Sequence, residues 1–174
     1  MTVPQVYVGP VAEPAAVEAV RRGGGEVVAS PREATAIAWL DWRPEHRPAL
    51  VAALHPGIAW VQLPTAGIES WLADGVIDDA RTWTNASHAF APAVAEHALA
   101  LTLAGCRRLA QAARARTWDE AIQGTTLRGA TVAVVGAGAI GRALIAMLAP
   151  LGAEAIAVTR RGRPVDGARE TVAA

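Results

Sequence analysis

The sequence predicts an α/β fold built on parallel β-sheets, and three observations carry that prediction. Short runs rich in valine and isoleucine alternate with longer alanine-rich runs along the 174 residues, an order typical of parallel sheets covered by helices. Apolar residues make up 52% of the chain, which is enough to bury a sizeable core. In the last third, one strand-like run leads directly into three glycines spaced G-x-G-x-x-G.

The first half of the chain is predicted to hold five strands and three helices. The strands are expected at 5–9, 26–29, 36–40, 58–64 and 81–85, and the helices near 12–21, 47–54 and 69–73. The glycines of RRGGG at 21–25 end the first helix, since glycine readily adopts the left-handed conformation of a helix C-cap. A strand follows these glycines, whereas a phosphate-binding loop would lead into a helix, so the cap is the favoured interpretation.

A long, mostly apolar helix is predicted from Pro92 to about Arg114. Proline suits the first turn of a helix, and arginines near the C-terminal end suit the helix dipole. A proline and charged residues interrupt the apolar stretch 89–106, so we expect a buried helix between two packed units, and no membrane span. The polar connector 117–129 then leads to a second α/β unit that opens at Ala130.

The glycine motif lies between a predicted strand and a predicted helix, as a dinucleotide-binding turn requires. TVAVV at 131–135 precedes it as a strand, Gly152 ends the helix that follows, and EAIAV at 154–158 forms the next strand. The first glycine permits a tight turn, the second lets the backbone approach a pyrophosphate, and the third allows close helix–strand packing. The cofactor-binding residues predicted here are Gly136, Gly138, Ala139, Ile140 and Gly141. The alternative is a glycine turn that binds nothing.

The residues after the second strand of this unit predict the cofactor. An NAD site has an acidic residue there that accepts hydrogen bonds from the ribose, and the usual methyltransferase glycine loop is also followed by an acidic residue. This chain reads Thr159, Arg160, Arg161, Gly162, Arg163 instead, a loop with three arginines. Guanidinium groups can bind a 2′-phosphate through paired, charge-assisted hydrogen bonds, whereas a carboxylate would repel it. The sequence therefore predicts NADP rather than NAD, and the alternative is a solvated basic loop.

Composition argues against several other classes of function. Basic and acidic residues both number 16, so the net charge gives no general attraction to nucleic acid or to anionic membranes. The single cysteine, Cys106, cannot form an intrachain disulfide and fits a reducing cytoplasm, and the start of the chain lacks the pattern of a secretory signal. His46, His55 and His88 have no metal-ligand spacing, so no metal site is predicted.

Several motifs in order resemble the D-isomer-specific 2-hydroxyacid dehydrogenases. They are VQLPTAGIESW at 61–71, TNASHAFAPAVAEHALALTLAGCRRL at 84–109, Trp118, and LRGATVAVVGAGAIGRAL at 127–144. The resemblance runs from about residue 58 to the end, while residues 1–57 fit by α/β pattern. It implies a flavodoxin-like substrate domain followed by the first β-α-β of a Rossmann coenzyme domain, truncated in this chain.

The resemblance also implies a division of the chain and a substrate site. Residues 1–91 would form most of the substrate domain, 92–112 a crossing helix, and 113–174 the start of the dinucleotide-binding domain. The turn Thr65, Ala66, Gly67 and Ile68 matches the family position where backbone N–H groups hold the substrate carboxylate. Gly67 could let consecutive amides converge on an anion, although an ordinary turn is the alternative.

The implied reaction is hydride transfer between NADP(H) and a small 2-oxoacid such as glyoxylate or hydroxypyruvate, in a homodimer. The family's catalytic arginine, glutamate and histidine are expected beyond Ala174, so no catalytic residue is assigned and the chain is interpreted as a fragment. The alternative is a non-catalytic dinucleotide-binding module or an inactive fragment. An amino-acid dehydrogenase has no support, because the chain contains no lysine.

Three features resemble functional residues but are assigned other roles. Glu96 and His97 are adjacent on a helix and so point in different directions, and the resemblance makes them a structural signature. RGRPVD at 161–166 has the spelling of the family's catalytic-arginine motif but directly follows the second strand, so Arg161 is assigned to the cofactor. Trp118 could lie in an arm that wraps a partner subunit.

Overall fold

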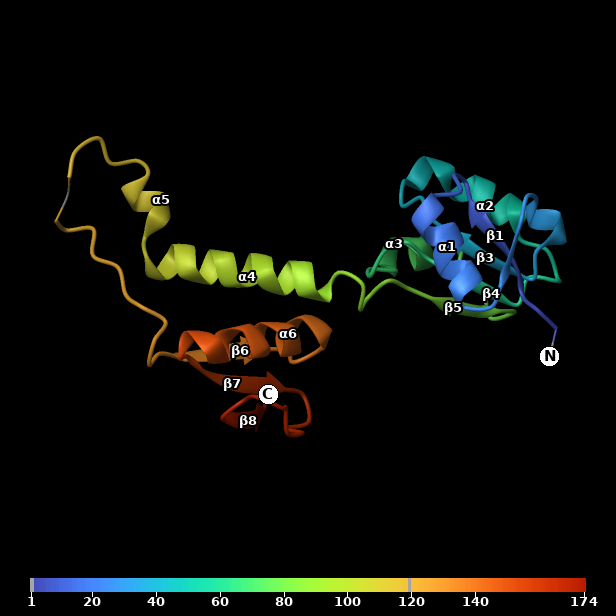
Figure 1. Ribbon diagram of the computed structural model, residues 1–174. Coiled ribbons are helices and arrows are strands. Elements are labelled where there is room, and N and C mark those ends of the chain that lie inside the picture. The colour runs from blue at the N-terminus through green and yellow to red at the C-terminus, as the bar shows by residue number, and fades with distance from the viewer. Residues whose placement is uncertain (1, 119) are drawn as a thin grey trace. The chain divides into compact units, whose positions relative to one another are not determined.

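A computed structural model describes residues 2–118 and 120–174, and it divides the chain into two compact units. The first unit runs up to Ser87 and the second from His88 to Ala174. Each unit has its own parallel sheet and its own core (Figure 1). The predicted α/β class is therefore confirmed. The predicted segments 1–91, 92–112 and 113–174 also carry assigned roles, and those roles stay predictions.

The first unit has a doubly wound sheet of five parallel strands. Its elements are β1 (Gln5–Gly9), α1 (Pro14–Arg22), β2 (Glu26–Val28), β3 (Ala36–Trp39), α2 (Arg47–Ala53), β4 (Trp60–Gln62), α3 (Glu69–Ala73) and β5 (Thr82–Thr84). The strand order is β2-β1-β3-β4-β5, which is the flavodoxin-like order. All eight elements lie where the sequence predicts them, with ends that differ by up to two residues, as is usual at fraying ends.

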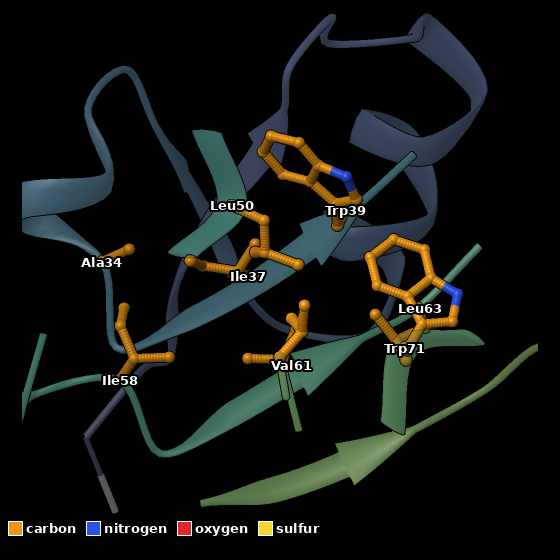
Figure 2. Close-up of a cluster of buried hydrophobic side chains, with 9 residues drawn as sticks. Ala34, Ile37, Trp39, Leu50, Ile58, Val61, Leu63 and Trp71 are labelled. Atoms are coloured by element: carbon orange, nitrogen blue, oxygen red, sulfur yellow. The ribbon is translucent and has the colours of Figure 1, made fainter. Parts of the chain in front are cut away.

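Both faces of this sheet are covered. On one face, Ile37, Trp39 and Val61 pack with Leu50 of α2 and Trp71 of α3 (Figure 2). On the other face lies a smaller cluster of Val6, Val8, Ala36 and Ala38, against which residues of α1 pack. Burial on both faces explains why β3 consists of four apolar, buried residues in a row, which is the pattern of a central parallel strand.

The second unit packs two layers of helix on a sheet of three parallel strands. Its elements are α4 (Ala91–Cys106), α5 (Leu109–Ala112), β6 (Thr131–Val135), α6 (Ala139–Leu148), β7 (Glu154–Thr159) and β8 (Glu170–Ala173). The strand order is β6-β7-β8, and α6 lies between α4 and the strands (Figure 1). Ile145 and Leu148 of α6 pack on Val134, Ala155 and Ala157 of the sheet, while Leu99 and Cys106 of α4 approach the same cluster.

Two expectations about this unit are corrected. The predicted helix from Pro92 to Arg114 ends at Cys106, because Arg108 adopts the left-handed conformation with φ of 50°, and only the short α5 follows. The sheet also has a third strand, β8, which was not predicted from the sequence. Residues 160–169 cross from β7 to the parallel β8 without a helix, so the usual helical signal of a parallel crossover is missing.

One face of the second sheet stays open, and β6 and β8 are its two edge strands. Alternate residues of β6 face away from α6, and Val135 among them has 81% of its surface exposed. β6 is also an edge strand that pairs only with β7 within the described residues. Exposed apolar residues on a parallel strand are uncommon, because parallel sheets are normally covered on both faces.

Candidate functional site

The three glycines of the motif, at the end of β6 and the start of α6, occupy three different structural environments. Gly136 has φ of +91°, a conformation that side chains rarely allow, and it turns the chain sharply out of β6. Gly138 is the residue before α6, and a Cβ on it would meet nothing within 4 Å. Gly141 is buried, and a Cβ there would collide with the carbonyl oxygen of Gly136. The geometry matches the turn and packing roles that the spacing predicts for Gly136 and Gly141, and the open space at Gly138 leaves room for a ligand to approach the backbone.

The backbone at this turn leaves donors available for an anion. Ala137 and Gly138 donate no amide hydrogen bond to any residue that the structure describes, whereas the Gly136 amide donates to Val158 O at 2.9 Å. Ala139 and Ile140 begin α6, where amides have no partner within the helix. The N-terminal end of a helix with such free amides attracts phosphate through both hydrogen bonding and the helix dipole.

A cavity of about 310 Å³ lies beside the turn and is surrounded by arginines. Its lining residues are Ala137, Arg142, Thr159, Arg160, Arg161, Arg163 and Val165. The structure thus brings the three predicted residues Thr159, Arg160 and Arg161 together with Arg163 of the same arginine-rich loop, and adds Arg142, which was not assigned from the sequence.

The hydrogen-bond donors that line this cavity are chemically suited to a phosphorylated cofactor. Thr159 Oγ1 is buried and has no hydrogen-bond partner in the structure. A buried hydroxyl without a partner is costly, so this atom is a candidate to bind a ligand oxygen. The lining side chains include four arginines and no carboxylate, which favours an anion and disfavours the ribose-binding acid of an NAD site.

The predicted substrate turn, Thr65 to Ile68, lies in the first unit after β4, at the carboxyl edge of its sheet. All four of its carbonyl groups accept hydrogen bonds, from the Ala86 amide, from Asn85 Nδ2, from Thr65 Oγ1 and from the Leu72 amide. None of its four amides donates to a residue that the structure describes. A turn with occupied carbonyls and free amides can bind a carboxylate.

The conformational role expected of Gly67 in this turn needs correction. A nest of converging amides commonly uses a left-handed residue, but Gly67 is not among the glycines with positive φ. A Cβ on Gly67 would lie 2.9 Å from Glu69 Oε2, which is the end of a flexible side chain that can move aside, so the space around Gly67 does not require glycine either. The role of this turn in binding substrate stays a prediction.

Two side chains that hold this turn were missed by sequence reasoning. Trp71 Nε1 donates to Thr65 Oγ1 at 3.2 Å, and Asn85 Nδ2 donates to Ala66 O at 2.9 Å. The tryptophan is almost fully buried in the core of the unit, so the turn is anchored from inside. Both residues stand within the quoted family motifs, which was the available signal.

A second polar group lies at the same edge, where β1 and β3 end. The Asp41 carboxylate accepts from Arg43 Nη2 at 2.6 Å and lies 2.6 Å from His46 Nδ1. These hydrogen bonds hold the pKa of Asp41 well below its ordinary value, and the one from Arg43 has the largest effect. Trp42 follows Asp41 in the sequence, has 64% of its surface exposed, and lines a cavity of about 310 Å³. In flavodoxin-like sheets the β1/β3 end is the switch point where ligands bind.

A third cavity, in the first unit, does not resemble a catalytic site. It measures about 440 Å³ and lies between α1 and the sheet of the first unit. Its lining is apolar apart from Gln62, and that amide already bonds Leu63 O and Thr84 Oγ1. A cavity without an available polar group offers nothing to orient a substrate.

Other expected features are placed as follows. Glu96 and His97 are exposed on α4, and Trp118 is exposed in the connector. Within residues 2–118 and 120–174, no cluster of three or more histidine, cysteine or acidic side chains could hold a metal ion. Over the same residues, no helix has both the length and the apolarity that crossing a bilayer requires.

Comparison with protein families identifies the second unit. Residues 98–174 match the model described as D-isomer specific 2-hydroxyacid dehydrogenase, NAD binding domain. The chain is also 36% identical over 159 residues to an uncharacterized protein in the proB 3' region of Corynebacterium melassecola, an alignment that covers 88% of this chain and 51% of that protein. The chain therefore spans about half the length of this curated relative.

Solved structures show the same fold. A D-isomer specific 2-hydroxyacid dehydrogenase from Xanthobacter autotrophicus Py2, in complex with NADPH and MES, matches with a TM-score of 0.71 and 19% identity, over 99% of this chain and 58% of that one. An NAD complex of such an enzyme from Lactobacillus delbrueckii ssp. bulgaricus matches with a TM-score of 0.66 and 15% identity, over 97% and 58%. At these identities the likeness concerns the fold, and both nicotinamide cofactors occur among the neighbours.

Proposed function

Since the chain belongs to the D-isomer specific 2-hydroxyacid dehydrogenase family, we propose that it is part of an oxidoreductase that transfers hydride between NADP(H) and a small 2-oxoacid or 2-hydroxyacid. The observation that carries the cofactor preference is the cavity beside the glycine turn, whose lining has four arginines and no carboxylate. Because the chain covers about half of its curated relative, the activity concerns the whole protein.

The residues of the second unit would hold the cofactor. The free amides at Ala137 and Gly138 and the start of α6 would bind the pyrophosphate, and Gly138 leaves room for it. Arg160 and Arg161 would bind the 2′-phosphate through charge-assisted hydrogen bonds, with Thr159 Oγ1 as a further donor. When bound, the nicotinamide ring supplies the hydride donor or acceptor of the reaction.

The residues of the first unit would hold the substrate carboxylate. The four amides of Thr65 to Ile68 supply the donors, and Trp71 and Asn85 keep the turn in shape. The arginine, glutamate and histidine that the family resemblance calls for are not assigned to residues of this chain. We propose glyoxylate or hydroxypyruvate as substrates, a homodimer as the assembly, and the cytoplasm as the compartment, where the free thiol of Cys106 would stay reduced.

A binding experiment on the chain tests the cofactor preference without requiring catalysis. NADPH and NADH are titrated separately into the purified chain, and binding is measured by isothermal titration calorimetry. We expect NADPH to bind at least about tenfold more tightly, since each charge-assisted hydrogen bond contributes roughly 1.5–3 kcal/mol. The double substitution Arg160→Gln, Arg161→Gln should remove most of that difference. Equal affinities in the unmodified chain would contradict the proposed preference.

An activity measurement tests the reaction class. The protein translated from the full gene should oxidise NADPH when glyoxylate or hydroxypyruvate is present. The reaction is followed as the loss of the absorbance of the reduced nicotinamide. Tight NADPH binding without oxidation by any small 2-oxoacid would favour a non-catalytic dinucleotide-binding module.

A further inference from the structure

We propose that Arg142, on the first turn of α6, is a specificity-determining residue for the 2′-phosphate of the cofactor, and that Arg163 assists it. The sequence pattern pointed only to the residues that directly follow β7. The inference rests on the proposed preference for NADP, and it adds that the phosphate is bound from two structural elements rather than from one loop.

The position of Arg142 follows from the packing of α6. Gly141 is pressed against the turn at Gly136, and a Cβ on Gly141 would lie only 3.3 Å from Val134 Cγ1, so α6 starts close to the end of β6. The Gly136 amide in turn bonds Val158 O on β7, which fixes the turn beside the next strand. The residue after Gly141 therefore emerges next to the loop that follows β7. Arg142 lines the same cavity as Arg160, Arg161 and Arg163.

Within residues 2–118 and 120–174, the four arginines at this cavity gather there without carboxylate partners. The arginines that form ion pairs in the described part of the chain lie elsewhere, and they are Arg43, Arg47, Arg81 and Arg169. None of the four arginines at the cavity has a carboxylate partner among the described residues. Four positive charges that converge on one hollow repel each other unless an anion lies between them. A phosphate dianion with three acceptor oxygens is an anion of suitable charge.

The two-element arrangement has a mechanical consequence. A phosphate bound by Arg160 and Arg161 alone would fix only the loop after β7, whereas a phosphate that also contacts Arg142 links this loop to α6. The buried, unpartnered Thr159 Oγ1 lies at the junction, at the end of β7. Binding of the phosphate should therefore order both elements together. The loss of Arg142 should reduce the protection of α6 from hydrogen exchange that phosphate binding produces.

The test compares two arginine substitutions of equal charge change in the full 174-residue chain. Arg142→Gln removes a guanidinium that lines the cavity, and the matched control Arg169→Gln removes one that is paired with Glu154 outside it. Affinities for adenosine 2′,5′-bisphosphate and for adenosine 5′-phosphate are measured by calorimetry. The ratio of these two affinities isolates the contribution of the 2′-phosphate.

We expect Arg142→Gln to lower this ratio by about tenfold and Arg169→Gln to leave it within about twofold. Arg163→Gln should have an intermediate effect. Hydrogen exchange with adenosine 2′,5′-bisphosphate bound should show less protection of α6 in Arg142→Gln than in the unmodified chain. Unfolding midpoints without ligand check that the variants fold, and the exposed position of Arg142 favours this.

The outcomes separate the inference from the proposed function. If the unmodified chain prefers the bisphosphate and Arg142→Gln keeps that preference in full, the inference is wrong and the NADP proposal stands. If the unmodified chain binds both ligands equally, both proposals are wrong. An equal loss in Arg142→Gln and Arg169→Gln would indicate a general effect of net charge and would also contradict the inference.

Discussion

Gly138 and Gly141 stand three residues apart, yet the structure separates their roles. A Cβ on Gly141 would collide with Gly136 O, so Gly141→Ala should lower the free energy of unfolding of the second unit by about 1–3 kcal/mol, in the range of overpacked cores. A Cβ on Gly138 meets no atom within 4 Å, so Gly138→Ala should leave stability nearly unchanged. Chemical denaturation followed by far-UV circular dichroism measures both.

Cofactor binding should separate these two variants in another way. Gly138→Ala places a methyl group where the pyrophosphate would approach, so it should abolish NADPH binding although the protein is folded. Normal NADPH affinity in Gly138→Ala would show that the backbone at Gly138 does not contact the cofactor. In that case the glycine motif would serve packing alone.

At the residue scale, sequence reasoning could place the candidate residues wherever their positions follow from a local pattern. The three glycines and the residues Thr159 to Arg161 lie in a fixed order after recognisable strands, so their neighbourhood could be predicted. The place of Arg142 beside the same cavity could not be predicted, because it depends on how closely α6 packs on β6. His46 was considered only as a metal ligand, whereas its partner is the Asp41 carboxylate five residues earlier in an irregular loop.

The loop after β3 makes the first unit sensitive to acid. Hydrogen bonds from Arg43 and His46 depress the pKa of Asp41 in the folded state, so the folded state favours the ionised carboxylate. The resulting stabilisation is fully present above the ordinary carboxyl pKa of about 4 and is lost as the pH falls toward the lowered folded value. Asp41→Asn removes this contribution.

This dependence can be measured by urea unfolding of the unmodified chain and of Asp41→Asn between about pH 7 and about pH 2. Five of the six tryptophans, at 39, 42, 60, 71 and 83, report on the first unit by fluorescence. The difference in stability between the two proteins should be largest near neutral pH and shrink progressively below about pH 4. A difference that stays constant over this range would contradict the role of the Asp41 charge.

At the scale of elements, every α-helix and β-strand of the first unit was predictable from sequence, but not every element of the second. The first unit alternates strongly between valine-rich strands and helices, so each element has its own signal. β8 has none, since ETVA is short and polar and no helix precedes it. The end of α4 was missed because the chain stays rich in helix-forming residues past Cys106, and only the left-handed Arg108 interrupts it.

The whole molecule consists of two units with separate cores, and a ligand of the second unit should stabilise that unit selectively. Adenosine 2′,5′-bisphosphate should slow hydrogen exchange in β6, α6 and β7 and leave β1, β3 and β4 unchanged. The expected size is RT ln(1 + [L]/Kd), about 2.7 kcal/mol at a ligand concentration of about a hundred times Kd. Equal protection of both units would indicate that the cores are energetically coupled.

The organisation into two α/β units was predictable because the long apolar helix and the polar connector separate two groups of strands. The third strand of the second sheet was not predictable, since it depends on how strands pair rather than on local pattern. Within β6 itself burial alternates, because Val134 faces α6 and is buried whereas Val135 has 81% of its surface exposed.

The residues assigned to the cofactor occupy one uninterrupted stretch of chain, from Gly136 to Arg163, within a single β-α-β unit. A recognition surface encoded this compactly is modular: it can be exchanged between proteins of the same architecture as one genetic segment. Grafting residues 131–163 into a related NAD-dependent dehydrogenase should carry cofactor choice with it, while the turn at Thr65 to Ile68, encoded far upstream, is inherited independently. With the cofactor and substrate residues assigned in this way, substitutions that change the preferred cofactor and substitutions that change the preferred substrate can arise independently of each other.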